Sequence, residues 1–546
     1  MLTYRPATLF LAFSAPAILA ANVQNPNLQL PPDAVVQKAA VKKIFTDSFA
    51  AYKKFAFGHD DLSPLSQSFS DGRNGWEAHL NLPRKYIMGL DDLFQEAVTF
   101  SSNIDFSKSQ TPDSVSVFET TIRYLGGLLS AFELSDQKYP VLLEKAKEVA
   151  DKLAFAWVGQ NALPFGFVNF TANSPTMATS NIAEAGTMKL TSPVQTDLLT
   201  LEWSTLSSHI GDQTYANLAV GAVRHIANLP DPLPGLPAQG IDPQDGKSVG
   251  GYVTWGGGSD SYFEYLIKYA RLSNTNDPLF ANTWHTAVDS SIKTLLRTSI
   301  PGNHVYLADF DDSRKIRHIG SHLACFNGGN WILGGKLLNN DTIVNIGLQL
   351  ADACWNTYAS TQTGIGPESF AFISSDGNFT GGTPANVADL KFNAQHGFYI
   401  TDGVYIQRPE VLETNFYAWR ATGDTKYLDR AASAVASFDK FLQTPTGYAG
   451  INDVNNVANG LVDDTESFWF AEVLKYLYLT FDDPNHISLD EYVFNTEAHP
   501  FKAPPAKSMY GTNTILPSKP FTIQSGPPLP AISPSRFDKN SRTHQE

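Results

Sequence analysis

The segment TESFWFAEVLKYLYLTF (465–481) carries apolar residues at three- and four-residue spacing, which predicts a helix that is apolar on nearly every side. The same spacing recurs in 115–134, 259–272 and 413–422. Helices of this kind are usually covered by other structure on both sides. We therefore expect them to be the inner helices of a two-layer, all-α arrangement.

A weak repeat indicates how the layers connect. Four times, beginning at residues 134, 210, 272 and 422, a helical pattern ends in a short polar turn and a new helix starts, with an Asp or Asn placed to cap it. The recurring unit is a helix hairpin, and a closed ring of antiparallel helix pairs is the economical architecture. A stacked open solenoid is the alternative. Strand-like segments at 251–255, 303–310 and 370–375 are expected to form loop hairpins at one end.

Composition narrows the functional classes. The chain has 546 residues, of which 42% are hydrophobic, enough for a large core. Its 39 Lys and Arg against 54 Asp and Glu give a net charge of −15, which argues against a nucleic-acid partner, because neutralising phosphates requires a basic face. Aromatic residues make up 12%, which suits carbohydrate stacking surfaces as well as a large core.

The N-terminus predicts entry into the secretory pathway. Residues 1–21 combine Arg5, an apolar run and small residues at the end, the pattern of a cleaved signal peptide. An uncleaved anchor holding the chain in the lumen of the ER or Golgi is the alternative. We expect no integral membrane span after cleavage, since no later apolar stretch is long enough. Three sequons fit secretion: Asn169, Asn340 and Asn378.

The domain plan is simple. Residues 35–501 are predicted to form one large domain. Residues 502–546 are rich in Pro, Ser and Gly and have no periodicity, which predicts a disordered tail. The two cysteines, Cys325 and Cys354, most simply form one disulfide in an oxidising compartment, and they make a poor zinc site.

Acidic side chains stand on four apolar helices, where a core helix would not have them. The sets are Glu119 with Arg123, Asp260 with Glu264, Glu410 with Glu413, and Glu466 with Glu472. Each alone could complement a helix dipole or form an internal ion pair. A ring of inner helices, however, would bring all four sets to one mouth. Paired carboxylates in a cleft are what glycoside hydrolysis needs, because one protonates the leaving oxygen and the other activates water.

Several segments together resemble the class I α-1,2-mannosidases, glycoside hydrolase family 47. They are 118–135, 259–269, 322–329, 408–427, 465–481 and 488–501, the last containing FNTEAHP. The resemblance implies an (α/α)7 barrel with a small β-hairpin plug. It also implies a mannosyl-oligosaccharide 1,2-α-mannosidase that removes terminal α-1,2-linked mannose from high-mannose N-glycans with inversion. We expect a monomer in the secretory pathway, or secreted.

The resemblance also implies roles for residues. Glu119 matches a general acid acting through a water, Glu410 the general base, and Asp260 a third carboxylate for which an acid role has also been argued. Thr496 matches the residue whose backbone carbonyl and hydroxyl hold a Ca²⁺ ion, whose shell water completes. Substrate-binding positions are matched by Arg123, His322, Arg408, Glu413, Glu466 and Glu497. Inversion predicts acid and base carboxyl groups roughly 6.5–9.5 Å apart. From the residues alone, His322 also reads as a buried structural histidine and Thr496 as a turn residue.

Two departures from the family pattern bear on activity. Residues 73–90 run across a place where the family has acids, and Asn81, Pro83, Arg84 and Lys85 stand there instead. This points either to a misassigned splice boundary or to a divergence that weakens catalysis, as in a mannosidase-like lectin of glycoprotein quality control. Gly258 would leave the pocket open, which predicts trimming of several mannoses. A different α/α-barrel glycosidase such as a glucanase is the third hypothesis, and it does not explain FNTEAHP.

Overall fold

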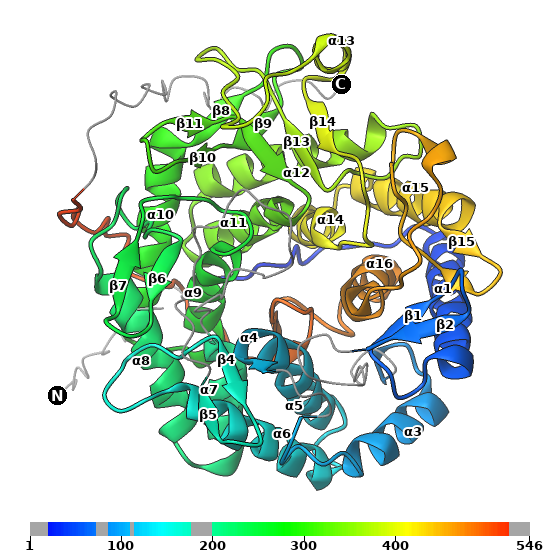
Figure 1. The fold of residues 1–546 in the computed structure, drawn as a ribbon, viewed down its shortest axis with the longest axis vertical. Coiled ribbons are helices and arrows are strands. Elements are labelled where there is room, and N and C mark those ends of the chain that lie inside the picture. The colour runs from blue at the N-terminus through cyan, green and yellow to red at the C-terminus, as the bar shows by residue number, and fades with distance from the viewer. Residues whose placement is uncertain (1–19, 72–85, 110–113, 176–198, 523–546) are drawn as a thin grey trace, which may run out of the picture.

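The chain forms a closed ring of helices in two layers (Figure 1), seen in a computed structural model that describes residues 20–71, 86–109, 114–175 and 199–522. The described inner helices are α5 (Gly126–Leu134), α7 (Thr200–Ile210), α9 (Asp260–Ser273), α11 (Phe326–Leu337), α14 (Glu410–Thr422) and α16 (Leu474–Phe481). The outer helices are α1 (Ala34–Phe55), α3 (Asp91–Ser102), α6 (Pro140–Leu153), α8 (Thr214–Asn228), α10 (Leu279–Thr294), α12 (Asp341–Ala359) and α15 (Lys426–Phe441). Because α1 packs against α15 and α16, the ring is closed, and the open solenoid is wrong.

The inner helices are buried on nearly every side, as their sequences predict. In α11 only Lys336 is not buried. Its glycines let neighbouring helices come close, since a Cβ at Gly328 would lie 2.7 Å from the side chain of Thr414 on α14. The outer helices have polar outward faces, such as that of α15. This division into two layers puts the acids of the inner helices inside the ring.

A β-hairpin enters the ring from one end. Strand β17 (Tyr492–Phe494) pairs antiparallel with β18 (Pro500–Lys502), and Figure 1 shows this dark orange segment inside the ring. The Ser130 hydroxyl of α5 donates a hydrogen bond of 2.8 Å to the carbonyl of Pro500. The Asn495 amide at the tip donates 3.0 Å to the carbonyl of Ile122. The expected hairpin plug is therefore present.

Short strands and single turns complete the fold at the loops. Residues 303–310 contribute β9 and β10 and residues 370–375 contribute to β13, as expected, whereas in 251–255 only Val253 makes a bridge, to Phe310. The strands are β1 (Asp61–Ser63), β2 (Ser68–Ser70), β3 (Val115–Ser116), β4 (Phe167–Asn169), β5 (Ser174–Pro175), β6 (Gly240–Asp242), β7 (Lys247–Val249), β8 (Leu296–Thr298), β9 (Val305–Leu307), β10 (Asp309–Phe310), β11 (Ile316–Arg317), β12 (Ile319–Ser321), β13 (Ser369–Ala371), β14 (Tyr399–Asp402), β15 (Gln443–Thr444) and β16 (Gly447–Tyr448). The remaining helical pieces are α4 (Val117–Thr120), α13 (Val387–His396), the π-helical turns η2 (Thr121–Leu125) and η6 (Trp469–Val473), and the 3₁₀ turns η3 (Ala154–Ala156), η4 (Leu323–Cys325) and η5 (Val457–Asn459).

The disulfide joins Cys325 at the end of η4 to Cys354 on α12, with an S–S distance of 2.05 Å. The predicted pairing is confirmed. No helix within the described ranges combines the length and apolar character that a membrane crossing requires.

The described part of the tail, residues 503–522, differs from the expected disorder. Tyr510 is 2% exposed, and its hydroxyl donates a 2.6 Å hydrogen bond to Asn274 at the end of α9. Further along, the backbone N–H of Leu516 donates to the hydroxyl of Thr286 on α10. Composition showed that the tail has no core of its own, but not that it can lie on the surface of the barrel.

Replacing Tyr510 should therefore lower the stability of the whole domain. We expect Tyr510→Ala to reduce the free energy of unfolding by about 3 kcal/mol, because it removes a buried aromatic ring. Tyr510→Phe keeps the ring and should cost only about 1 kcal/mol. Denaturant unfolding measures both, and a Tyr510→Ala protein as stable as the wild type would show that the tail is not anchored there.

Candidate active site

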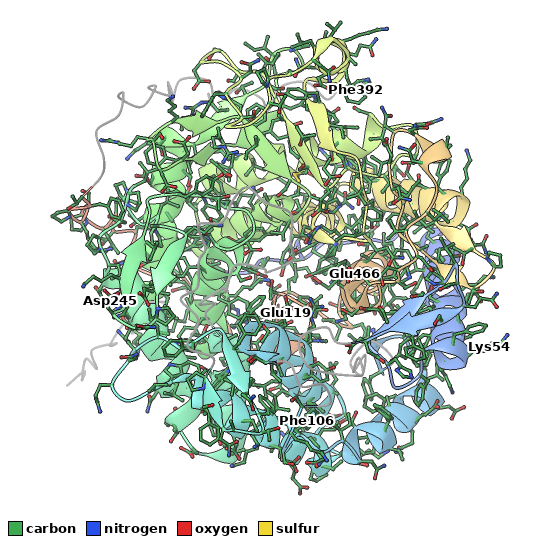
Figure 2. All side chains as sticks on the ribbon, in the orientation of Figure 1. Lys54, Phe106, Glu119, Asp245, Phe392 and Glu466 are labelled. Carbon is green, nitrogen blue, oxygen red and sulfur yellow. A yellow bond between two sulfur atoms is a disulfide. The ribbon has the colours of Figure 1, made fainter. Side chains whose placement is uncertain are left out.

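The predicted acidic residues meet at the centre of the ring. Figure 2 shows Glu119 and Glu466 at its inner edge, whereas Lys54 and Asp245 lie on its outside. The two π-helical turns, η2 and η6, lie beside this centre and carry Arg123 and Glu472. Such turns occur frequently at functional sites, because they shift side chains out of regular helical register.

Arg123 ties one side of the site together. Its Nε donates to Glu119 Oε2 at 2.8 Å, and its Nη1 donates to Glu497 Oε1 at 2.7 Å. Nη1 also donates to the hydroxyl of Ser467, at 2.8 Å. The guanidinium thus connects α4 to the hairpin tip and to the segment before η6. It fixes Glu119, the residue expected to be the acid, in place.

Glu410 occupies the first position of α14 and is held from two sides. Its Oε2 lies 2.8 Å from Nδ1 of His322, and its Oε1 lies 3.7 Å from Nη1 of Arg408. Burial raises the pKa of Glu410, but the hydrogen bond to His322 and the charge of Arg408 outweigh it and leave the pKa below its usual value. Glu410 is therefore an ionised carboxylate, the form that a base requires.

His322 and Arg408 are themselves fixed by neighbours. Nε2 of His322 lies 2.8 Å from the hydroxyl of Tyr358, and Arg408 Nε donates to Glu368 at 2.7 and 2.8 Å. His322 is 1% exposed, which agrees with its interpretation as a buried histidine. Its ring nevertheless contacts Glu410, the candidate base. It orients Glu410 rather than standing apart from the site.

Asp260 is the first residue of α9, and its pKa is shifted upward, in the opposite direction to that of Glu410. Burial raises its pKa to about 7, and the negative charges of Glu264 and Glu410 add to the effect. At neutral pH and below, Asp260 therefore carries a proton to a substantial degree. The site holds one carboxylate that stays charged and one that holds a proton, which is the division that acid–base chemistry needs.

The floor of the site is crowded with carboxylates from several helices. Burial raises the pKa values of Glu413 and Glu472, and the charge of Glu410 raises both further. Burial also raises the pKa of Glu202 on α7 to about 7. Its Oε1 accepts from Tyr265 and Asn495 at 2.7 Å, while its buried Oε2 has no hydrogen-bond partner among the described residues.

Thr496 sits at the tip of the hairpin over this floor. Its backbone N–H donates to the hydroxyl of Tyr265 at 3.2 Å, and Glu497 follows it directly. Among the described residues, no three His, Cys, Asp or Glu side chains are arranged to hold a metal ion together. The donor set around Thr496 nevertheless fits a hard cation bound through neutral oxygens and water, because the Tyr265 hydroxyl that accepts from its N–H donates in turn to the buried carboxyl group of Glu202. The unpartnered Oε2 belongs to that carboxyl group.

Sequence reasoning missed several members of this network. Glu368 lies in a loop and holds Arg408, and Lys268 on α9 forms a buried ion pair with Glu264. Glu202 on α7 is a single carboxylate, without the second charged residue that marks each predicted set, and α7 also contains several Ser and Thr residues. The sequons Asn169, Asn340 and Asn378 are not part of the site: Asn169 lies in β4, Asn340 caps α12 and Asn378 is exposed.

Of the two departures from the family pattern, the structure describes the one at Gly258 and not the one in residues 73–90. Asn81, Pro83, Arg84 and Lys85 lie outside the described residues. Gly258 is described, with a φ of +89° that favours glycine, and a Cβ there would lie 2.5 Å from the amide nitrogen of Gln239. The space beside Gly258 is thus shared with the Gln239 side chain, which donates to the carbonyl of Gly257 at 2.6 Å.

A closed helical barrel with several carboxyl groups gathered at its centre is the arrangement of a glycoside hydrolase of the α/α-barrel class. Residues 44–503 match the model of glycosyl hydrolase family 47, and the chain belongs to this family. It is 39% identical over 495 residues to a probable mannosyl-oligosaccharide α-1,2-mannosidase 1B of Aspergillus clavatus, covering 85% of this chain and 92% of that relative. A mannosyl-oligosaccharide α-1,2-mannosidase 1B of Emericella nidulans is 37% identical over 486 residues, again with 85% and 92% covered.

A solved structure agrees with the sequence relatives. The α-1,2-mannosidase from Trichoderma reesei superposes with a TM-score of 0.80 at 34% identity, over 86% of this chain and 99% of that one. The predicted family and the predicted (α/α)7 barrel are both confirmed.

Proposed function

We propose that the protein hydrolyses terminal α-1,2-linked mannose from high-mannose N-glycans. The observation that carries the proposal is the contact of Glu410 with His322 and Arg408 in the same buried site as Asp260, whose pKa is raised to about 7 by burial. The names of the family relatives supply the sugar and the linkage. Mannose release from a nine-mannose glycan tests the proposal, and the number of mannoses released shows whether Gly258 leaves the pocket open with the Gln239 side chain beside it.

The residues divide the chemistry between them. Glu410 takes a proton from the attacking water, and an acid on the other side protonates the leaving oxygen. Asp260 and Glu119 are the two candidates for that acid, with Glu119 positioned by Arg123 and acting through a water. Attack by water opposite the leaving group gives inversion, with the two carboxyl groups roughly 6.5–9.5 Å apart.

We assign Ca²⁺ as the cofactor, with the carbonyl and hydroxyl of Thr496 as its protein ligands. When bound, the ion would offset the negative charge of the floor and bind sugar hydroxyls. Glu413, Glu466 and Glu497 then orient the sugar and the water shell. The buried carboxyl group of Glu202, linked to Thr496 through the hydroxyl of Tyr265 and left with one unpartnered oxygen, supports this assignment.

The raised pKa of Asp260 and the lowered pKa of Glu410 are those of the free enzyme, so they predict a bell-shaped dependence of kcat/KM on pH. Glu410 must be ionised, so its lowered pKa keeps activity down to below pH 4.5, its ordinary value. An acid must be protonated, so activity through Asp260 falls as the pH rises past about 7. In Asp260→Asn the rate falls and the alkaline limb near pH 7 disappears. A limb that stays in place in this variant, but disappears in Glu119→Gln, assigns the acid to Glu119.

A mannosidase-like lectin is the second candidate, because Pro83, Arg84 and Lys85 stand where the family has acids. The same glycan assay separates the two functions, since a lectin binds the nine-mannose glycan without releasing mannose.

We also propose a secreted or luminal location. Residues 1–21 act as the signal peptide, residues 35–501 form the catalytic domain, and the chain works as a monomer. Asn378 is the most accessible of the three sequons, and its replacement by Gln should remove one glycan from the secreted protein.

A further inference from the structure

The candidate base is connected to the outer layer of the barrel through two side chains. Glu410 contacts Nδ1 of His322 at 2.8 Å, and the other ring nitrogen, Nε2, lies 2.8 Å from the hydroxyl of Tyr358. Tyr358 belongs to α12, an outer helix, whereas Glu410 begins an inner one. The three side chains therefore form a line that runs from the site into the outer layer.

Tyr358 is held firmly at the end of this line. It is fully buried, and its ring stacks on that of Trp355 with the centroids 5.3 Å apart. The loop before β13 lies directly on the ring, since a Cβ at Gly366 would be 2.5 Å from a ring carbon of Tyr358. The same loop carries Glu368, whose carbonyl accepts from the backbone N–H of His322 at 2.9 Å. One loop thus fixes both the tyrosine ring and the histidine backbone.

The chemistry of the partners sets the direction of each hydrogen bond. An ionised carboxylate only accepts, so Nδ1 of His322 carries the proton that faces Glu410. In a neutral imidazole the other nitrogen is then an acceptor and needs a donor. The hydroxyl of Tyr405 is a donor toward the carbonyl of Arg408, at 3.1 Å, and toward the oxygen of Tyr358. This arrangement leaves the proton of Tyr358 for Nε2.

We propose that Tyr358 is a positioning residue for the base: its hydroxyl donates to Nε2 of His322, fixes the proton of the imidazole on Nδ1 and so keeps Glu410 oriented and ionised. With the proton on Nε2 instead, Nδ1 would turn a lone pair toward the carboxylate and repel it. This inference rests on the proposed function and adds to it a residue that acts on the base without touching the sugar.

The test is Tyr358→Phe, which removes one oxygen atom and keeps the ring. The measured quantity is kcat/KM for the nine-mannose glycan as a function of pH. We expect the acid limb, which reports the ionisation of Glu410, to move upward by about 0.7 pH unit, a fivefold change in the ionisation constant and the effect of losing one neutral hydrogen bond. KM at the pH optimum should stay within about twofold of the wild-type value, because Tyr358 is fully buried behind His322.

Other charged groups also face Glu410, and Tyr358→Phe leaves all of them in place. They come from the loop before α14, from α9, from α14 itself and from η6, and they are Arg408, Asp260, Glu413 and Glu472. A shift of the acid limb in this variant therefore reports the hydrogen bond to His322 and not a change in these charges.

Tyr306→Phe is the matched control. Tyr306 is 3% exposed, and its hydroxyl donates to α12 as well, to the carbonyl of Ala353 at 3.4 Å, but it does not contact His322. Its acid limb should coincide with that of the wild type. If Tyr358→Phe lowers only the stability or the rate and its acid limb does not move, the proposal is overturned and Tyr358 is a packing residue.

Nitrogen-15 NMR of histidine-labelled protein tests the same proposal without catalysis. The signals of His322 are those that disappear in His322→Gln. At pH 7 we expect a protonated Nδ1 and an unprotonated Nε2 in the wild type, and a changed Nε2 signal in Tyr358→Phe. A ring protonated on both nitrogens in the wild type, or identical spectra in the two proteins, overturns the proposal. If the wild type releases no mannose, the proposed function fails by itself, and these spectra still decide the role of Tyr358.

Discussion

Glu410→Gln is expected to lower kcat for mannose release by about a thousandfold, the middle of the range for removing a general base. The glutamine has nearly the same shape and can still accept a hydrogen bond from His322, so substrate binding and folding should be retained. What it loses is the ability to take a proton from water. The kcat measured with the nine-mannose glycan, alongside the KM, separates this loss from weakened binding.

Glu133→Gln provides the control for this experiment. Its side chain is 12% exposed against 13% for Glu410, and it also pairs with a histidine, His209, but outside the acid network. Its rate should match the wild type. A Glu410→Gln enzyme within about threefold of the wild-type rate would remove Glu410 from the role of base, whatever the family suggests.

The inner helices and their acids were predictable for one physical reason. A charged residue in a helix that is apolar on nearly every side has no solvent to face, so it must meet a partner, a ligand or another buried charge. Glu119, Asp260 and Glu410 carry that signal. Glu202 lacks a second charged residue three or four positions away, and its helix contains several Ser and Thr residues, so the sequence does not single it out.

The contacts that tune these acids could not be read from the sequence. His322 and Glu410 are 88 residues apart, and Glu368 and Arg408 are 40 apart. Nothing in local spacing brings such residues together; the ring does, by placing the start of α14 beside the loops that precede α11 and β13. The tail shows a different limit, because its composition reports the lack of an internal core and not its fit to the surface of α9 and α10.

Removing Ca²⁺ is expected to have the second large effect, a fall in mannose release of about a hundredfold or more, because a cation that binds the sugar contributes several kcal/mol to such reactions. Added Ca²⁺ should restore the rate, whereas Mg²⁺ should not, since Mg²⁺ prefers a small octahedral shell and keeps its waters. Thr496→Val removes one proposed ligand and should raise the Ca²⁺ concentration needed for half-maximal activity. Thr480→Val changes a buried threonine away from the hairpin, whose hydroxyl donates to the carbonyl of Tyr476 within α16, and should leave that concentration unchanged.

Proton release gives this prediction a readout that does not depend on catalysis. Without the ion, burial raises the pKa of Glu413 to about 8 and that of Glu202 to about 7, so these two groups hold protons near pH 6.5, and burial and repulsion from Glu497 also raise the pKa of Glu472. A bound cation favours their charged forms and expels those protons, so adding Ca²⁺ to the chelator-treated protein in weak buffer should acidify the solution. Thr496→Val should show the same release only at higher Ca²⁺. Full activity after chelation, together with no proton release on adding Ca²⁺, would mean that the carboxylates of the floor serve the sugar alone and that no ion completes the site.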